Sequence, residues 1–326
     1  MLRGIASKLV FGAVGALAWS ACAGESDSPE TGDGSITTGV SASATAGSQQ
    51  ASTGAWGAGH QGGGGEGAGS TGPYPIVFTP AVDPFNDSTF RGGQLAAHIE
   101  TILAETGYDK VVIIGHSQGG LDARVVAHDR PDLVAAVVTV ATPHGGTPVA
   151  DVALGLLDDP NFAGIVDDLV NAIGAPLYDQ VGNETAVSKP MHLFSSPGIA
   201  AFNAAYPDAP GVFYASITGR TDHSLGGVAC VPDVKPAFMT TNESDDDPTD
   251  PFFFLTETLI DGDGSIPNDG LVRVVDARHG EFWGCIPADH LDEVGHLLGD
   301  GPGFGNDFHH HEFYRDLVAH LRSLGY

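Results

Sequence analysis

Positively charged residues are scarce in this sequence. Of its 326 residues, 13 are Lys or Arg and 41 are Asp or Glu, which gives a formal net charge of −28 at pH 7. Nucleic acids and anionic lipid surfaces are bound through clusters of positive charge. The composition therefore argues against a nucleic-acid partner and against charge-driven docking on anionic membranes, and it suits a neutral substrate.

Long apolar runs are also few. The first, Leu9–Trp19, is too short to cross a bilayer as a helix. The basic residues Arg3 and Lys8 precede it and small residues follow it, which predicts a secretory signal peptide over residues 1–22. Cys22 is either the lipidated first residue of an outer-membrane-anchored lipoprotein, or the middle of an Ala-x-Ala cleavage site that releases a secreted protein.

Only two cysteines remain after Cys22. They are Cys230 and Cys285, an isolated pair. In an exported protein such a pair predicts one disulfide, and the alternative is two free buried thiols.

A segment without Lys or Arg follows the signal peptide. Residues 23–72 consist mostly of Gly, Ser, Thr and Ala with a few acids. Such a composition buries too little apolar surface to offset the entropy of ordering, which predicts a disordered linker. The rest of the chain, residues 73–326, has the length of a single α/β domain with its own core.

The most informative segment of that domain is Gly115–Gly119, which reads Gly-His-Ser-Gln-Gly. An apolar, β-branched strand is predicted before it at Lys110–Ile114, and a helix after it at Gly120–His128. Strand, Gly-x-Ser-x-Gly and helix in this order predict a nucleophile elbow, a tight turn that holds a serine at the carboxyl edge of a sheet. Ser117 is therefore the candidate nucleophile, and the backbone N–H of Gln118 is the candidate oxyanion donor.

Strand and helix patterns alternate along the domain, which predicts an α/β fold with a doubly wound, mainly parallel sheet. Two short amphipathic segments, Val149–Leu157 and Ile165–Ile173, are predicted helices that either form a lid over the sheet edge or belong to the core. The other predicted strands are Pro75–Thr79, Leu133–Val140, Val212–Thr218 and Leu271–Val275, and the other predicted helices are Arg91–Thr106, Ser196–Ala205 and His311–Leu324.

A serine nucleophile needs a histidine base, and the histidine needs a carboxylate that fixes its tautomer. In α/β-hydrolases these residues follow in the order Ser, acid, His. Asp269 and His290 fit this order. The rival acids are Asp261 and Asp263, and the rival histidines are His279, His296 and His309–His311.

The three adjacent histidines, His309–His311, are disfavoured as a metal site, because they cannot all face one cation from a helix.

Seven short motifs follow one another along the domain: Arg91–Leu95, Gly115–Gly120, Arg130–Ala135, Ala141–Gly146, Phe202–Pro207, Asn268–Val272 and His290–Val294. Together they resemble the pseudomonad-type bacterial triacylglycerol lipases of the α/β-hydrolase superfamily. The resemblance covers most of Tyr74–Tyr326. It implies Ser117 as nucleophile, Asp269 as orienting acid and His290 as base.

The resemblance also implies a function. It indicates a triacylglycerol lipase that hydrolyses esters through an acyl-enzyme at a lipid–water interface, without an organic cofactor. Some members of the family need a dedicated foldase, so a lipase-specific foldase is an expected partner. Two alternatives stay open. One is a polyester depolymerase or other exported esterase with the same triad, and the other is a weakly active or non-catalytic surface lipoprotein with the hydrolase fold.

The same family carries a structural calcium near the histidine loop. Matched residue by residue, the resemblance implies carboxylate ligands at Asp247 and Asp292 and backbone carbonyl ligands at His296 and Asp300. Such an ion fixes the position of the catalytic loop and takes no part in the chemistry. Asp250 is a rival for the first carboxylate, and the alternative for all of these acids is simple solvation.

The sequence departs from the family in two places. Cys285 lies further from the triad acid, and closer to His290, than the second cysteine usual in the family. The sequence also runs from Tyr74–Val77 directly into Phe78–Val82, without the His-Gly segment whose backbone N–H supplies the second oxyanion donor. Loss of one such donor costs about 2.7–4 kcal/mol in other enzymes, so reduced activity is expected unless another N–H replaces it.

Overall fold

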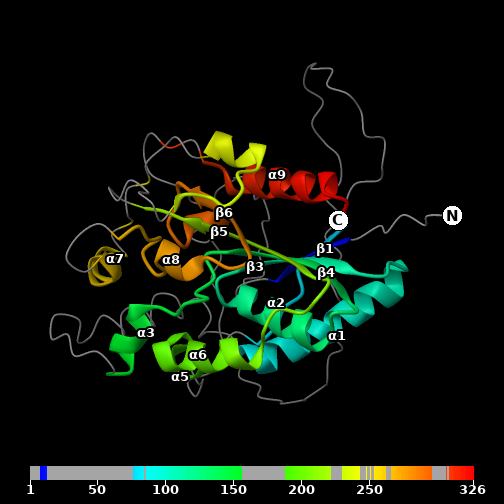
Figure 1. Cartoon of the computed structure of the whole chain (residues 1–326), viewed down its shortest axis with the longest axis horizontal. Coiled ribbons are helices and arrows are strands. Elements are labelled where there is room, and N and C mark those ends of the chain that lie inside the picture. Colours follow the sequence, from blue (N-terminus) through cyan, green and yellow to red (C-terminus); the bar gives the residue numbers. More distant parts are fainter. Residues whose placement is uncertain are drawn as a thin grey trace, which may run out of the picture.

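A computed structural model contains a sheet of six parallel strands in the order β2-β1-β3-β4-β5-β6, with helices on both faces (Figure 1). The predicted α/β fold with a doubly wound, mainly parallel sheet is confirmed. The structure describes residues 8–12, 76–83, 86–155, 188–221, 230–242, 247, 250, 253–261, 266–295, 306 and 308–326.

The middle of the sheet is buried on both faces. Alternate residues of β3 pack in opposite directions, with Val112 and Ile114 in one core cluster and Val111 and Ile113 in the other. This explains why the strand is a continuous apolar run in the sequence. The main strands are β3 (Val111–His116), β4 (Val134–Val140), β5 (Phe213–Gly219) and β6 (Glu281–Ile286).

Each face of the sheet has its own helices (Figure 1). Leu95 and Ile99 of α1 pack on one face together with α2, and Leu317 and Leu321 of α9 pack on the other. The side chain of Asp87 caps α1, so this helix begins three residues before its predicted start. The bounds are α1 (Ser88–Thr106), α2 (Gln118–Asp129), α9 (His310–Ser323) and the 3-10 helix η2 (Ala237–Asn242).

Shorter helices follow β4. Val149 of α3 packs with Phe253, Ile260 and Leu291, so this part of the first predicted lid helix belongs to the core. The second predicted lid helix, Ile165–Ile173, lies outside the described residues, and the lid stays a prediction. None of the helices described is long and apolar enough to cross a membrane. The bounds are α3 (Pro148–Ala153), α5 (Ser188–Phe194), α6 (Ser196–Ala205), α7 (Phe254–Asp261), α8 (Val274–Ala277) and the 3-10 helix η3 (Asp292–Val294).

Two elements near the end of the sheet differ from the prediction. The predicted strand Leu271–Val275 is wrong, because Val274 begins helix α8 and the residues before it form a turn. In that turn the Asp269 side chain accepts backbone N–H groups that a strand would use in its ladder. The last strand, β6, was not predicted from the sequence, because Gly284 interrupts its apolar pattern.

The N-terminal strand β1 (Lys8–Gly12) lies between β2 (Val77–Phe78) and β3. It falls inside the predicted signal peptide, whereas Cys22 and the predicted linker lie outside the described residues. Processing of the leader would remove β1 and leave β3 with an open edge. Mass spectrometry of the mature protein tests the signal peptide: a chain that begins at Cys22 or Gly24 supports it, and recovery of peptides that contain Lys8–Gly12 contradicts it.

Candidate active site

Ser117 occupies a sharp turn between β3 and α2. Its φ and ψ are 51° and −129°, and a positive φ is rare in residues other than glycine. Glycines make the turn possible, because a Cβ on Gly115 would lie 2.6 Å from backbone atoms of Gly119 and Gly120. A Cβ on Gly120 would overlap the hydroxyl of Thr142, which donates to the Ser117 carbonyl at 2.7 Å. The segment therefore has the geometry of a nucleophile elbow.

The side chains of Ser117, His290 and Asp269 form one hydrogen-bonded chain. His290 Nε2 lies 2.9 Å from Ser117 Oγ, and His290 Nδ1 lies 2.8 Å from Asp269 Oδ2. Asp269 is fully buried, and its Oδ1 accepts the N–H groups of Leu271 and Val272 at 2.9 and 2.6 Å. These bonds hold the carboxylate toward the histidine. The structure thus brings together the three residues predicted as a triad.

The rival residues lie elsewhere. His279 pairs with Asp208 at 2.8 Å, and His309–His311 lie at the start of α9. Asp261 is the last residue of α7. Asp263 and His296 lie outside the described residues. Among the candidates that the structure describes, Asp269 and His290 are the pair that contacts Ser117.

A second buried pair supports the histidine. His116 Nε2 lies 2.9 Å from Glu293 Oε2, and the ring of His116 is tilted against the ring of His290 with centroids 4.7 Å apart. Burial raises the pKa of Glu293 well above its usual value, and neighbouring acids raise it further. Neither residue was predicted from the sequence, although each belongs to a motif that resembles the family. His116 precedes the nucleophile and Glu293 follows the base by three positions.

The oxyanion side of the site is partly described. Gln118 is the first residue of α2, so its N–H has no acceptor within the helix. The Gln118 side chain is engaged elsewhere, since its Nε2 group donates a hydrogen bond to the carbonyl of Asn86 at 2.8 Å. The neighbouring strand β1 has Gly12 in register with Gly115, two residues before the nucleophile. The residues after Gly12, where a second donor would be sought, lie outside the described residues.

Three buried carboxylates meet beside the histidine loop. Asp247, Asp289 and Asp292 each have an oxygen within 4.8 Å of the other two. Both carboxylate oxygens of Asp247 and one of Asp289 are buried without a hydrogen-bond partner. Burial is the main cause that raises the pKa of Asp247 to about 8, and the negative charge of the neighbouring Asp289 is the second. Burial also raises the pKa of Asp289, to about 6. Such a cluster is costly without a cation and suits a hard divalent ion.

Two of the four predicted calcium ligands, Asp247 and Asp292, belong to this cluster. The two predicted carbonyl ligands, His296 and Asp300, lie outside the described residues. Asp289 was not predicted. The signal that could have found it is its place directly before His290, because a carboxylate there lies in the loop that the ion is expected to hold.

The predicted disulfide joins Cys230 to Cys285. Cys285 belongs to β6, where it packs with Val274 and Phe282. The strand ends at Ile286, four residues before the candidate base. The disulfide therefore anchors the strand from which the histidine loop extends.

Comparison with known proteins shows relatives of this chain. The family model described as the alpha/beta hydrolase fold matches residues 63–185. A triacylglycerol lipase of Vibrio cholerae is 31% identical over 260 residues, which cover 76% of this chain and 78% of the relative. A triacylglycerol lipase of Pseudarthrobacter phenanthrenivorans is 32% identical over 234 residues, which cover 64% of this chain and 73% of the relative.

Among solved structures, a metagenomic carboxyl esterase has a similar fold. It superposes with a TM-score of 0.52 at 17% identity, over 76% of this chain and 66% of the esterase. This likeness supports the fold seen here, with a parallel sheet between two helical layers.

Proposed function

Since this chain belongs to the bacterial triacylglycerol lipases of the α/β-hydrolase superfamily and is an ester hydrolase, we propose that it cleaves acylglycerol esters at Ser117 through an acyl-enzyme. The observation that carries the proposal is the hydrogen-bonded chain from Ser117 through His290 to Asp269. A serine alcohol becomes a useful nucleophile only when a base takes its proton, and His290 is that base.

The first half of the proposed reaction forms an ester bond to the enzyme. Ser117 Oγ attacks the carbonyl carbon of the substrate while its proton passes to His290 Nε2. Asp269 accepts a hydrogen bond from His290 Nδ1–H, which fixes the tautomer and stabilises the imidazolium. The N–H of Gln118 donates to the developing oxyanion. Collapse of the tetrahedral intermediate breaks the bond to the alcohol, which leaves with the proton from His290.

The second half repeats these steps with water. His290 takes a proton from water, the hydroxide adds to the acyl carbon, and Ser117 Oγ leaves with the proton that His290 returns. The fatty acid is released and the enzyme is restored. Gln118 is the oxyanion donor identified among the described residues, and the same N–H serves both oxyanions.

Substrate profiling tests the proposed substrate class. We expect hydrolysis of emulsified long-chain triacylglycerols to exceed that of tributyrin and of soluble short-chain nitrophenyl esters, because a lipase acts at the lipid–water interface. A preference for short soluble esters, or for a polyester film, would favour the esterase or depolymerase alternative. Rates are compared above and below the solubility limit of each ester.

We also propose a structural calcium ion held by Asp247, Asp289 and Asp292, the buried acids beside the histidine loop. When bound, such an ion neutralises the clustered carboxylates and fixes the loop that carries His290. Its role is to hold the base in position. The unpartnered buried oxygens of Asp247 and Asp289 support the proposal.

Removal of calcium is expected to lower the melting temperature by about 5–10 °C, because a ligand at 100 times its Kd contributes about 2.7 kcal/mol. Differential scanning calorimetry with calcium and with EGTA measures the shift. The Asp289→Asn variant should lose most of this response, whereas Asp109→Asn, at an exposed site, should keep it. A melting temperature indifferent to EGTA would contradict the calcium site.

A further inference from the structure

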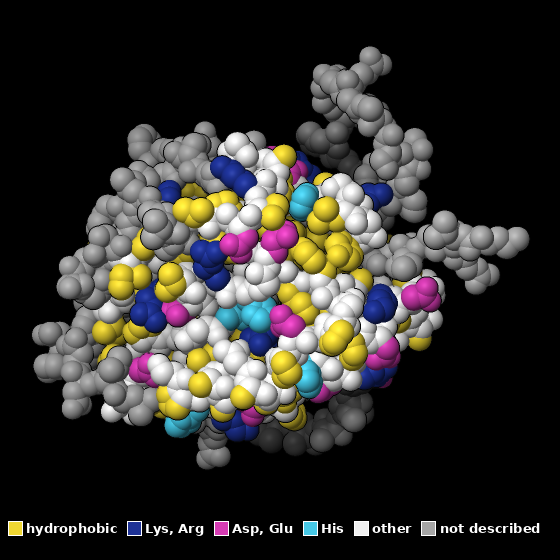
Figure 2. All heavy atoms as spheres, in the orientation of Figure 1, with side chains coloured by type: hydrophobic (Ala, Val, Ile, Leu, Met, Phe, Trp, Pro, Cys, Tyr) yellow, Lys and Arg dark blue, Asp and Glu magenta, His cyan; other side chains and the backbone are white. Residues whose placement is uncertain are grey.

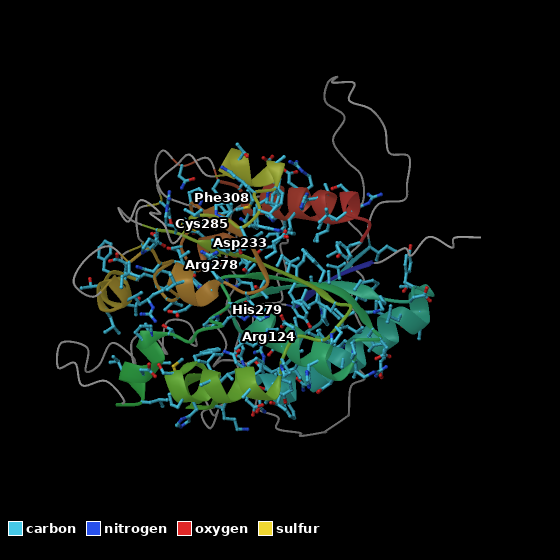
Figure 3. All side chains as sticks on the ribbon, in the orientation of Figure 1. Arg124, Asp233, Arg278, His279, Cys285 and Phe308 are labelled. Atoms are coloured by element: carbon cyan, nitrogen blue, oxygen red, sulfur yellow. A yellow bond between two sulfur atoms is a disulfide. The ribbon has the colours of Figure 1, made fainter. Side chains whose placement is uncertain are left out.

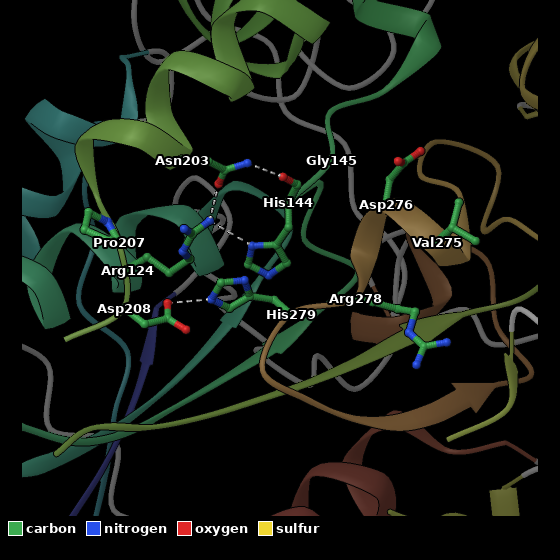
Figure 4. A pocket seen from close by; sticks show the side chains of 10 residues that line it. All are labelled: Arg124, His144, Gly145, Asn203, Pro207, Asp208, Val275, Asp276, Arg278 and His279. Carbon is green, nitrogen blue, oxygen red and sulfur yellow. Dashed lines mark hydrogen bonds and ion pairs between the residues drawn. The ribbon is translucent and has the colours of Figure 1, made fainter. Parts of the chain in front are cut away.

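A cavity of about 420 Å³ lies between α2 and α8 (Figure 4). Arg124 and His144 line it on one side, and Val275 and Arg278 line it on the other. It opens on the face shown in Figure 2, where histidine, basic and acidic side chains meet near the centre. Arg124 is seven residues after Ser117 on α2, about 10 Å along the helix, so the cavity is separate from the candidate nucleophile.

All charged side chains of the cavity wall except Arg124 have ion-pair partners. Asp208 pairs with His279 at 2.8 Å, and the stacked rings of His279 and His144 lie 4.4 Å apart. Arg278 pairs with Asp233 at 2.9 Å (Figure 3), and Asp276 pairs with Arg273. Each of these side chains therefore has a partner at ion-pair distance.

Arg124 is the exception. It is 4% exposed, and in the described part of the chain no carboxylate lies within ion-pair distance of its guanidinium. Its NH1 group donates to Asn203 Oδ1 at 2.8 Å and contacts His144 Nδ1 at 3.3 Å, and its NH2 group donates to the carbonyl of Tyr206 at 3.1 Å. Nε has no partner. All of these acceptors are neutral, and the guanidinium carbon lies 5.2 Å from the centre of the Phe202 ring. Within the described residues, the positive charge therefore has no carboxylate in direct contact.

The histidine beside Arg124 adds no charge of its own. His144 Nδ1 faces the guanidinium as an acceptor, which places the ring proton on Nε2, where it donates to Thr139 Oγ1 at 3.1 Å. Burial, with His279 and Arg124 nearby, lowers the pKa of His144 well below its usual value, so the ring is neutral. Asp208 acts on Arg124 from a longer distance and is itself paired with His279.

A buried cation without a counter-ion is strongly unfavourable. From this buried guanidinium, which lies beside an open cavity and has no carboxylate at ion-pair distance among the described residues, we propose that the cavity binds a small organic carboxylate. One negative charge would balance Arg124, and Arg278 at the opposite wall would attract the anion. A dianion such as phosphate fits less well, because the carboxylates of Asp208 and Asp276 also line the cavity. This site is independent of the triad and of the proposed ester substrate.

Titration of the full-length protein with sodium butyrate, followed by amide chemical shifts in NMR, tests the proposal. We expect saturable shifts at Gly145 and His279, which line the cavity, at constant ionic strength. Inorganic phosphate is titrated in parallel. Absence of saturable shifts with butyrate would overturn the proposal, and shifts with phosphate alone would overturn its commitment to a carboxylate.

A matched pair of variants locates the binding. Val275, 51% exposed at the cavity wall, is replaced by glutamate to place a like charge beside the anion. We expect Val275→Glu to weaken butyrate binding about tenfold. Val231→Glu makes the same change at an exposed valine outside the cavity and should leave the affinity unchanged. Equal affinity in both variants would show that butyrate binds elsewhere and would contradict the site.

Discussion

Replacement of Ser117 by alanine is expected to lower ester hydrolysis by a factor on the order of 10⁵–10⁶, as loss of a triad serine does in other hydrolases. The variant removes the only atom that forms a bond to the acyl group, while its backbone keeps the N–H of Gln118 in place. Hydrolysis of a soluble nitrophenyl ester measures the rate. Because Ser117 has a positive φ, a thermal melt of the variant shows whether the substitution also changes stability.

A fluorophosphonate probe separates an activated serine from a folded but inactive site. The wild-type protein should be labelled once, and Ser117→Ala should not be labelled. Ser323→Ala, an exposed serine on α9, is the matched control and should behave as wild type. Failure of the calcium-loaded wild-type protein to react would contradict the proposed hydrolysis and favour a non-catalytic surface lipoprotein.

Loss of the Arg91 side chain is expected to destabilise the fold by about 3–5 kcal/mol, because it leaves a buried carboxylate without its counter-ion. Arg91 Nε contacts Asp122 Oδ2 at 2.8 Å, and both side chains are 2% exposed. The pair joins α1 to α2, the helix that begins at the nucleophile elbow. Urea unfolding of Arg91→Met measures the loss. Arg315→Met, at an exposed ion pair on α9, is the control and should change stability by less than about 0.5 kcal/mol.

The pH dependence of this variant follows from Asp122. Burial raises the pKa of Asp122 from 3.8 to about 6, against the opposing effect of Arg91. A carboxyl with a raised pKa in the folded state takes up protons on folding, so its contribution to stability falls as pH rises from about 4 to about 6. The defect of Arg91→Met should therefore be larger near neutral pH than near pH ~4, where Asp122 is neutral.

Removal of both charges provides the second test. Arg91→Met with Asp122→Leu should recover most of the lost stability, because no unpaired charge stays buried. If the double variant is as unstable as Arg91→Met alone, packing at this position and not the ion pair explains the loss. That result would contradict the electrostatic interpretation.

The candidate active site could be predicted well because its residues lie in local patterns. Gly115–Gly120 forms a tight turn because side chains at Gly115 and Gly120 would overlap nearby atoms. Residues adjacent in the sequence therefore specify this geometry. Asp269 and His290 could be chosen through motif order. The predicted strand Leu271–Val275 failed because the Asp269 side chain binds the following N–H groups, a bond that apolar periodicity does not reveal.

The sequence by itself determined the α/β alternation, the elbow, the acidic charge and the family, since these depend on residue type and short spacing. Only the tertiary structure decided which charges meet. Ser117 and His290 are 173 positions apart. Asp122, His116 and Asp247, which meet Arg91, Glu293 and Asp289 respectively, are also distant from them in the sequence. Arg124 shows the reason most clearly. Whether a buried guanidinium has a counter-ion depends on distances of a few ångströms between segments that the fold alone brings together.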